Sequence, residues 1–521
     1  MTPNRRGVVA TVDRRATYAG VDVFERGGSA VDAAIAANAV LSVTAPHLCG
    51  MGGDLIALVF DGATVRSLNA SGRSGRGADA GGLRRDGHTT MPLRHDVRSV
   101  TVPGCVDGWT ELHQAGARLP LAELLAPAIE LAEHGCGAAP SLVDSVRGLD
   151  PAGRAALAEL ANQATATDAP VRRPGLAAAL AAIAADGRDG FYRGSFGRGL
   201  VTMAPELFTD DDLGTSCAQW VEPLSVPAWG HVVHTVPPNS QGYVTLGALA
   251  IADAQGIPDD QDDPGWPHVL IEASILAAYD RPDRLHDQAA GPALLGSIIE
   301  RGDRLDAERA SALPIGAGPG DTTYVAAVDD AGVGVSLIQS NGSGFGSWLA
   351  EPTTGINLHN RGVGFTLRSG HPAELGPRRR PPHTLAPTIV TRPDGTLAAV
   401  VGSAGGDAQP QIVLQLLARL LRHRESAAAA VAAPRWVLRS GPTGFDTWTH
   451  AGPATVVRLE SGTPVGWVDG LRGRGHRIEM SPRGDGTFGH AHAITVSVDG
   501  DVAGAAEPRI GLEPHTGVSP S

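Results

Sequence analysis

A layered α/β (α+β) fold with a mainly antiparallel sheet is predicted for this 521-residue chain, and three observations predict it. Segments rich in small apolar residues and typical of packed helices fill much of the first half. Two pairs of short β-rich runs dominate the part after residue 321. Each pair is joined by a turn that contains Asp and Gly. No G-x-S-x-G elbow follows a strand, which disfavours an ordinary α/β hydrolase.

The first 321 residues begin with an alanine-rich helix predicted over 30–43, for which Ser29 is a suitable N-cap. A glycine loop over 50–54 leads into a strand over 55–60. Further helices are predicted over 121–133, 176–184 and 268–279, and a further strand over 231–236. From about 288 to 321, Pro, Gly, Ala and charged residues mix without a clean period, which indicates a mobile linker.

The last 200 residues read mainly as strands. Runs over 323–328 and 333–338 flank an Asp-Asp-Ala-Gly turn, and runs over 388–391 and 396–401 flank an Arg-Pro-Asp-Gly turn. Both are hairpin signals. The glycine loop over 402–407 then opens a helix that runs to about residue 421. Helices therefore stand before and after the two hairpins, and the linker lies between the first group of helices and the hairpins.

Composition bounds the function. With 42% hydrophobic and 19% charged residues, the chain can bury a large core. A formal net charge of −13 argues against nucleic acid and against an anionic membrane surface as partners. No apolar run is long enough to span a bilayer, and the Arg-rich first 20 residues lack the apolar centre of a signal peptide. A cytoplasmic location is therefore expected.

Neither a cofactor nor a metal is predicted. The four cysteines, Cys49, Cys105, Cys136 and Cys217, show no CxxC spacing, so the pattern suggests neither a zinc site nor a disulfide framework. Four reduced, buried or half-buried thiols are expected. The sequence also contains no recognisable phosphate loop or nucleotide-binding fingerprint.

Thr322 is the strongest candidate for chemistry. The turn Gly318-Pro319-Gly320-Asp321 leads directly into a strand that begins with Thr322. If the bond between Asp321 and Thr322 is cut, Thr322 gains a free α-amine beside its own hydroxyl. An α-amine has a pKa near ~8, so it can accept the hydroxyl proton at neutral pH and activate a poor nucleophile. A plain strand start is the alternative interpretation.

Several blocks in order along the chain, from about residue 7 to 517, resemble the γ-glutamyltransferase (γ-glutamyltranspeptidase) family of N-terminal nucleophile hydrolases. They are GGSAVDAAIAAN, GMGGD, TVPGCVDGW, LAPAIELAEHG, PPNSQG, DTTY, GFGS, PTIV, GSAGGD, GRGH and EPRIGL. The resemblance implies a four-layer αββα sandwich. It also implies self-cleavage into a large segment, 1–321, and a small segment, 322–521, intertwined in one domain and possibly paired as a dimer of heterodimers.

The resemblance also assigns the machinery. It implies Thr322 as the nucleophile of both self-cleavage and turnover, and Thr323 as the second threonine, which steadies the hydroxyl and the amine. Gly405 and Gly406 match the oxyanion-hole glycines. Backbone N–H groups of a glycine loop at a helix start can point at a developing oxyanion, and losing one such donor costs about 10²–10³ in rate. A simple helix entry capped by Asp407 is the alternative.

Departures from the family fall in substrate recognition. The arginine that precedes Glu-Thr-Ala-Pro in the family aligns near Ser71, and that motif is absent. The family's Asn-Asn-Gln-Met-Asp-Asp-Phe becomes a segment in which Arg361 replaces an amide and Gly364 replaces a carboxylate, and its paired serines become His383 and Thr384. Losing the carboxylate removes the partner of a substrate ammonium, worth about 1.5–3 kcal/mol. Free γ-glutamyl amides, glutathione included, are therefore expected to be poor substrates.

These variant blocks resemble the γ-glutamyltransferase-like branch that includes glutaryl-cephalosporin acylase relatives. The residues expected to contact substrate are Ser340, Asn341, Arg361, His383, Thr384 and Asp407. Arg361 is the candidate for a carboxylate on the acyl chain, because a guanidinium suits bidentate binding, although a structural arginine fits as well. His383 is expected to orient groups and not to carry protons, since the Thr322 amine already supplies the base.

The leading hypothesis is therefore an autoprocessed enzyme that hydrolyses or transfers a γ-glutamyl-like or glutaryl-like acyl group of a small-molecule amide. One alternative is a C–C bond hydrolase of an actinobacterial natural-product pathway, in which Trp348 narrows the pocket. Both reactions pass through a tetrahedral adduct. An alternative of another class is a non-catalytic binding protein on the same fold.

Overall fold

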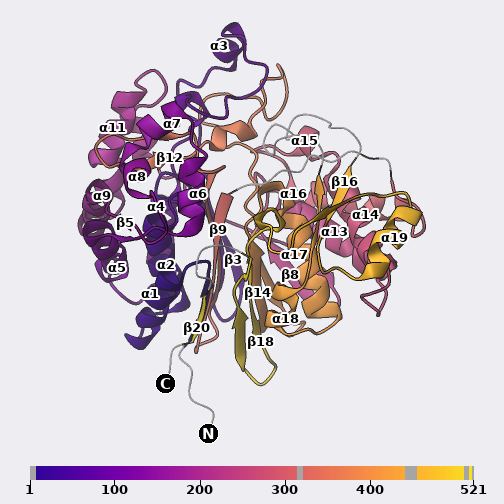
Figure 1. Ribbon diagram of the computed structural model, residues 1–521. Helices are drawn as coiled ribbons and strands as arrows, with labels where there is room; N and C mark the ends of the chain where they lie inside the picture. The colour runs from indigo at the N-terminus through magenta and orange to yellow at the C-terminus, as the bar shows by residue number, and fades with distance from the viewer. Residues whose placement is uncertain (1–6, 312, 314–320, 440–454, 510–514, 519–521) are drawn as a thin grey trace.

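Two antiparallel sheets lie face to face, and helices cover the outer face of each (Figure 1). The computed structural model describes residues 7–311, 313, 321–439, 455–509 and 515–518. The strand order is β20-β1-β9-β10-β2-β3-β6 in the first sheet and β19-β18-β14-β13-β8-β7 in the second. The expected four-layer αββα sandwich is confirmed.

The strands of the first sheet are β1 (Gly7–Thr11), β2 (Asp54–Phe60), β3 (Val65–Ala70), β6 (Gln219–Val221), β9 (Asp321–Asp329), β10 (Gly334–Gly342) and β20 (His515–Val518). Those of the second are β7 (Leu224–Ala228), β8 (His231–Thr235), β13 (Thr388–Thr391), β14 (Leu397–Ser403), β18 (Ala491–Val496) and β19 (Val502–Ala505). Three smaller sheets are built from β15 (Trp436–Arg439), β16 (Val456–Glu460) and β17 (Arg477–Ser481), from β4 (Cys136–Gly137) and β5 (Pro170–Val171), and from β11 (Leu349–Ala350) and β12 (Asn357–Leu358).

The helices of the first outer layer include α1 (Arg14–Glu25), α2 (Ala30–Thr44), α4 (Cys105–Gly116), α5 (Leu121–His134), α9 (Pro174–Asp186), α10 (Arg188–Tyr192) and α11 (Ser195–Met203). Those of the second include α13 (Gly242–Gln255), α14 (Gly265–Ala278), α16 (Gly291–Glu300), α17 (Gln409–Leu417), α18 (Ala427–Ala432) and α19 (Val465–Gly473). Shorter helices are α3 (Ala80–Arg85), α6 (Pro140–Arg147), α7 (Pro151–Ala156), α8 (Ala158–Gln163), α12 (Asp210–Gly214) and α15 (Arg281–Arg284). Among the described residues, no helix is both long and apolar enough to cross a bilayer.

Alternation along β9 divides its side chains between two cores. Tyr324, Ala326 and Val328 join the core between the two sheets, whereas Val325 and Ala327 join the core under the first helical layer. Successive side chains of a strand point to opposite faces, so a strand in an inner layer must be apolar on both. Thr322 and Thr323 therefore face different layers.

Most elements expected from the sequence are confirmed with small shifts of their ends. The helix expected over 268–279 is α14, the first hairpin is β9 with β10, and the second is β13 with β14. The helix after the glycine loop is α17, and a π-helical turn, Ala418–Arg422, extends it to about the expected end.

The linker expected from about 288 to 321 is partly wrong. α16 and the 3-10 turn Arg301–Arg304 occupy its first half. Leu294, Leu295 and Ile298 are buried there, and Ile298 packs against Gly247 of α13. This apolar face spans less than two helical turns, too few for its period to stand out among the flanking glycines and charges. Residues 312 and 314–320 lie outside the described residues.

The two sheets approach each other closely where β14 crosses β9. A Cβ atom added at Gly402 would lie 2.5 Å from the Tyr324 ring. We expect Gly402→Ala to destabilise the protein by about 1–3 kcal/mol, because overpacking forces the ring or the sheet to move. Gly296→Ala is the matched control: nothing lies within 4 Å of its added Cβ, and the substitution in α16 should stabilise slightly. Equal urea midpoints for both variants would contradict this.

Candidate active site

Three neighbouring strands bring polar side chains together at one end of the sandwich. Ser340 of β10 pairs with Asp54 of β2, and on the other side β10 pairs with β9 through Gln339 and Thr323. The register between β9 and β10 shifts after that pair, so that Gly342 lies opposite Asp321. Asp54, Ser340 and Thr322 all follow the parity of the residues that face the second sheet.

Ser340 links the predicted nucleophile to the bond that it would cut. The Thr322 hydroxyl donates to Ser340 Oγ at 3.1 Å, and Ser340 Oγ donates to the carbonyl oxygen of Asp321 at 2.7 Å. The N–H of Gly342 also donates to Ser340 Oγ, at 2.9 Å. Thr322 is 1% exposed. In the uncut chain the hydroxyl is thus hidden from solvent and connected through one serine to the Asp321 carbonyl.

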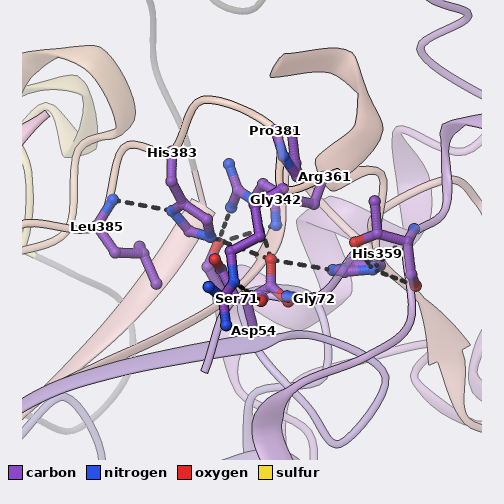
Figure 2. A network of polar contacts seen from close by, with 12 residues as sticks. Asp54, Ser71, Gly72, Gly342, His359, Arg361, Pro381, His383 and Leu385 are labelled. Atoms are coloured by element: carbon purple, nitrogen blue, oxygen red, sulfur yellow. Dashed lines mark hydrogen bonds and ion pairs between the residues drawn. The ribbon is translucent and has the colours of Figure 1, made fainter. Parts of the chain in front are cut away.

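A buried carboxylate, Asp54, contacts several polar groups beside these residues (Figure 2). Its Oδ1 accepts the backbone N–H of Gly72 at 2.9 Å. Its Oδ2 lies 3.0 Å from His383 Nε2, 3.6 Å from His359 Nδ1 and 3.5 Å from Arg361 Nε. Burial alone would raise the pKa of Asp54, but these three neighbours outweigh it and hold the pKa well below its usual range. Asp54 is therefore ionised.

His383 is held in one tautomer. Its Nδ1 accepts the backbone N–H of Leu385 at 3.2 Å, so the ring proton sits on Nε2 and is donated to Asp54. Burial, together with the charge of Arg361, lowers the pKa of His383 to about 4. The ring is neutral at pH 7 and donates to Asp54.

Arg361 is buried beside two carboxylates. Besides its contact with Asp54, its Nη2 lies 3.4 Å from Ser340 Oγ. Burial lowers the pKa of Arg361, while the charges of Asp54 and Asp407 oppose that shift. Its guanidinium already neutralises Asp54, which favours the structural interpretation over a group waiting for a substrate carboxylate.

The side chain of Gln241 fixes the position of the glycine loop that follows β14. Its amide nitrogen donates to the carbonyl oxygens of Gly406 and Thr384, at 3.0 Å each, and its oxygen accepts from Arg281. Gly405 and Gly406 have φ of 138° and 53°, in the region that side-chain-bearing residues rarely adopt. These φ values favour glycine at the bend, which leads into α17 beside the site.

Asp407 is fixed by a buried ion pair. Its Oδ1 lies 3.0 Å from Arg281 Nη2, and both side chains are 2% exposed. The pair joins α15 to the glycine loop after β14. Arg281, Asp407 and Gln241 together fix the loop that carries Gly405 and Gly406.

The carboxylate of Asp321 also has partners. Its Oδ2 accepts the N–H of Gly344 at 2.6 Å. Burial raises its pKa, whereas that N–H and the positive charge of Arg94 oppose the shift. Arg94 lies over the Trp348 ring, 4.6 Å from its centroid, and the Trp348 indole N–H donates to the carbonyl oxygen of Gly344 at 2.8 Å. Trp348 thus supports the loop that binds Asp321.

Two expected site residues lie elsewhere. The Thr323 hydroxyl contacts the carbonyl oxygen of Gln339 at 3.4 Å, on the side of the first helical layer, so Ser340 and not Thr323 contacts the Thr322 hydroxyl. Asn341 shares that side and donates to the Pro46 carbonyl at 3.2 Å. Strand parity separates both from the group around Thr322.

Sequence reasoning missed Asp54, His359 and Gln241 as members of the site. Asp54 is the last residue of the block GMGGD, and Gln241 precedes the final glycine of PPNSQG. A polar residue at the edge of a glycine loop, at the parity of the inner sheet face, is the signal that could have found Asp54. The sequence offers no comparable signal for His359.

The chain is similar over nearly its whole length to several known proteins. The sequence profile described as gamma-glutamyltranspeptidase matches residues 16–513. The glutathione hydrolase-like YwrD proenzyme of Bacillus subtilis (strain 168) is 33% identical, over 95% of this chain and 95% of its own. The oxamate amidohydrolase proenzyme of Klebsiella pneumoniae subsp. pneumoniae is 32% identical, over 96% and 97%. The crystal structure of a cephalosporin acylase from Bacillus halodurans superposes with a TM-score of 0.88 at 32% identity, over 98% of this chain and 96% of its own.

The Asp54–Arg361 pair should be costly to break on one side only. We expect Asp54→Asn to destabilise the protein by about 3–5 kcal/mol, because it leaves the buried guanidinium uncompensated. Adding Arg361→Met should recover much of that loss. Asp144→Asn, which breaks the exposed pair with Arg147, is the control and should change little. Urea denaturation measures the stability of Asp54→Asn, Arg361→Met, the double variant and Asp144→Asn. A double variant whose loss of stability equals the sum of the losses of the two single variants would refute the coupling.

Proposed function

Because the chain belongs to the γ-glutamyltranspeptidase family of enzymes, we propose that it cleaves itself between Asp321 and Thr322 and then uses N-terminal Thr322 to hydrolyse or transfer the acyl group of a small amide. One observation carries the proposal: Ser340 connects the Thr322 hydroxyl to the carbonyl oxygen of Asp321. The nucleophile, a proton acceptor and the reacting carbonyl already form one hydrogen-bonded chain.

Self-cleavage follows from this chain. Thr322 Oγ attacks the Asp321 carbonyl carbon while Ser340 takes up the hydroxyl proton and donates its own to the developing oxyanion. As the C–N bond breaks, the proton on the tetrahedral oxygen passes to the Thr322 nitrogen, which leaves an ester with a free Thr322 amine. Water hydrolyses the ester, so Asp321 gains a carboxylate and Thr322 regains its hydroxyl.

Turnover repeats this attack on an external amide. The new α-amine of Thr322 accepts the hydroxyl proton, the acyl group moves to Thr322 Oγ, and the amine product leaves with a proton. Water or an acceptor amine then takes the acyl group. The N–H groups of Gly405 and Gly406 would stabilise the tetrahedral oxyanion, on the loop that Gln241 and Arg281 fix in place.

The two segments, 1–321 and 322–521, should remain one domain after the cut. β9 pairs with β1, and β10 pairs with β2, so strands of the small segment lie between strands of the large one in the first sheet. The second sheet joins β8 of the large segment to β13 of the small one. Separating them would expose the core between the sheets.

The acyl group preferred by the site is proposed to carry a carboxylate but no ammonium. Asp321 is the acyl group that the uncut chain presents, and Gly344 and Arg94 accommodate its carboxylate. Gly364 provides no partner for an ammonium, and a Cβ added there would lie 2.3 Å from the Pro382 carbonyl oxygen. The amide reaction is favoured over C–C cleavage because the carbonyl already bound to Ser340 belongs to an amide.

Mass measurement tests the cleavage. Under denaturing conditions the wild type should give two fragments that meet at Asp321 and Thr322, whereas Thr322→Ala should stay intact because it has no nucleophile. Ser340→Ala should slow cleavage by about 10² or more, since the carbonyl loses its hydrogen-bond donor.

Thr391→Ala, a buried strand threonine in the second sheet, controls for general loss of packing and should cleave at the wild-type rate. An intact wild-type chain would reject the proposed nucleophile and bring the binding-protein hypothesis forward.

Acyl preference is measured with paired p-nitroanilides on the cleaved enzyme. The glutaryl compound should exceed the γ-glutamyl compound in kcat/KM by at least about tenfold, because the two differ by the ammonium that Gly364 leaves unpaired. Gly364→Asp should not raise kcat/KM for the γ-glutamyl compound, since the added side chain meets the Pro382 carbonyl. Faster hydrolysis of the γ-glutamyl compound would refute the proposed preference.

A further inference from the structure

Three buried side chains converge between α14 of the second helical layer and the start of β17. His268 and Glu272 stand four residues apart on α14 and therefore share one face of the helix. His476, which directly precedes β17, reaches them across the interface between the segments. His268 Nδ1 lies 2.8 Å from His476 Nε2, and His476 Nε2 lies 3.8 Å from Glu272 Oε1. The three ligand-type atoms all lie within 4.8 Å of one another.

The outer contacts aim these atoms inward. His268 Nε2 lies 2.8 Å from the carbonyl oxygen of Asp306, which can only accept, so Nε2 carries the proton and the Nδ1 lone pair points into the cluster. Glu272 Oε2 accepts the backbone N–H of Ser311 at 3.0 Å. Among the described residues its other oxygen, Oε1, has no hydrogen-bond partner although Glu272 is only 1% exposed. A buried carboxylate oxygen without a donor points to a missing cation.

We propose that His268, Glu272 and His476 bind a divalent first-row transition-metal ion, with Zn²⁺ as the best-matched ion. Two imidazole nitrogens and one carboxylate oxygen are a common protein ligand set for Zn²⁺, and a water molecule would take the fourth position. The hydrogen bonds from His268 to Asp306 and from Ser311 to Glu272 are the outer contacts that orient metal ligands.

The distances allow an ion with a small adjustment. Metal–ligand bonds of about 2.0–2.2 Å in a tetrahedron require ligand atoms about 3.3–3.6 Å apart. The two separations from His476 Nε2, 2.8 Å and 3.8 Å, lie on either side of that range, and the third pair of ligand atoms lies within 4.8 Å. The metal takes the place of the proton that His476 Nε2 shares with His268 Nδ1; as that proton leaves, His476 gains one on Nδ1, so the ring binds the ion as a neutral imidazole. Burial and the neighbouring His268 lower the pKa of His476 to about 4, so the imidazole is neutral at pH 7.

The position of the site suggests what the ion does. His268 and Glu272 belong to the large segment and His476 to the small one, so after the proposed cleavage the ion would bridge two chains. The stretch 306–311 is anchored to the same place by Asp306, by Ser311 and by the N–H of Ala310, which donates to the Arg474 carbonyl at 2.8 Å. The ion would hold the segments together near the end of the large one; this consequence, unlike the site itself, rests on the proposed cleavage.

The test is Co²⁺ titration of chelator-treated protein, followed by visible absorption and by thermal unfolding with and without Zn²⁺. We expect one Co²⁺ per chain, ligand-field bands typical of four-coordination, and a Tm raised by Zn²⁺. Glu272→Gln keeps the shape and an acceptor for Ser311 but loses the charge, so it should bind Co²⁺ at least about tenfold more weakly. His476→Gln should abolish binding, and His113→Gln, in the other helical layer, should bind as the wild type does.

Wild-type protein that binds no stoichiometric Co²⁺, or Glu272→Gln with unchanged affinity, would overturn the proposal. Because Glu272→Gln is nearly isosteric, it decides the question even if His476→Gln does not fold. Uncut Thr322→Ala should bind Co²⁺ as tightly as the wild type, so failure of the metal site and failure of the proposed cleavage are distinguishable. In the cleaved protein, chelator should lower the urea concentration at which the two segments separate; no change there would reject the bridging role.

Discussion

Alternation of side chains along β9 and β10 is the constraint on which both core and site depend. Each strand lies in an inner layer, so one parity must serve the core between the sheets and the other the core under the helices. At the ends of the strands the same alternation continues with polar residues. It brings Thr322, Ser340 and Asp54 to one face and sends Thr323 to the other. A slip of one residue would exchange these faces and bury the wrong hydroxyl.

Buried charge is the second organising element. Asp54 with Arg361, and Arg281 with Asp407, place four charged and almost fully buried groups below the strand ends. Such pairs add little net stability but tolerate few alternative arrangements. Here they fix two things that the chemistry needs: the strand end that carries Ser340, and the glycine loop that carries Gly405 and Gly406. His383, held in one tautomer, connects Asp54 to the backbone N–H of Leu385.

Tightness of the uncut site agrees with a self-cleaving precursor. Thr322 is almost fully buried, and the carboxylate of Asp321 occupies the space beside Gly344. A precursor with an open pocket would admit substrate before the Thr322 α-amine, the proposed base, had formed. In the proposed reaction the same residues would first hold the chain's own acyl group, and its release would make room for that of a substrate.

Much of this could be predicted from the sequence. The hairpins, the glycine loop and the alanine-rich helix follow from turn chemistry and local periodicity, and the Gly-Pro-Gly-Asp-Thr segment marked Thr322. α16 escaped prediction because its buried face comprises only Leu294, Leu295 and Ile298. Arg361 was suited to a carboxylate by type alone, whereas its pairing with Asp54, over 300 residues away, decides what it contacts.

The sequence by itself determined the elements, the family and the residue at the predicted cut, because these depend on neighbours along the chain. Only the tertiary structure decided that Ser340 and not Thr323 contacts the Thr322 hydroxyl, and that His476 meets His268 and Glu272. Those contacts depend on strand register and on packing between distant segments. Local pattern does not specify either, because long-range pairing is set by the whole core.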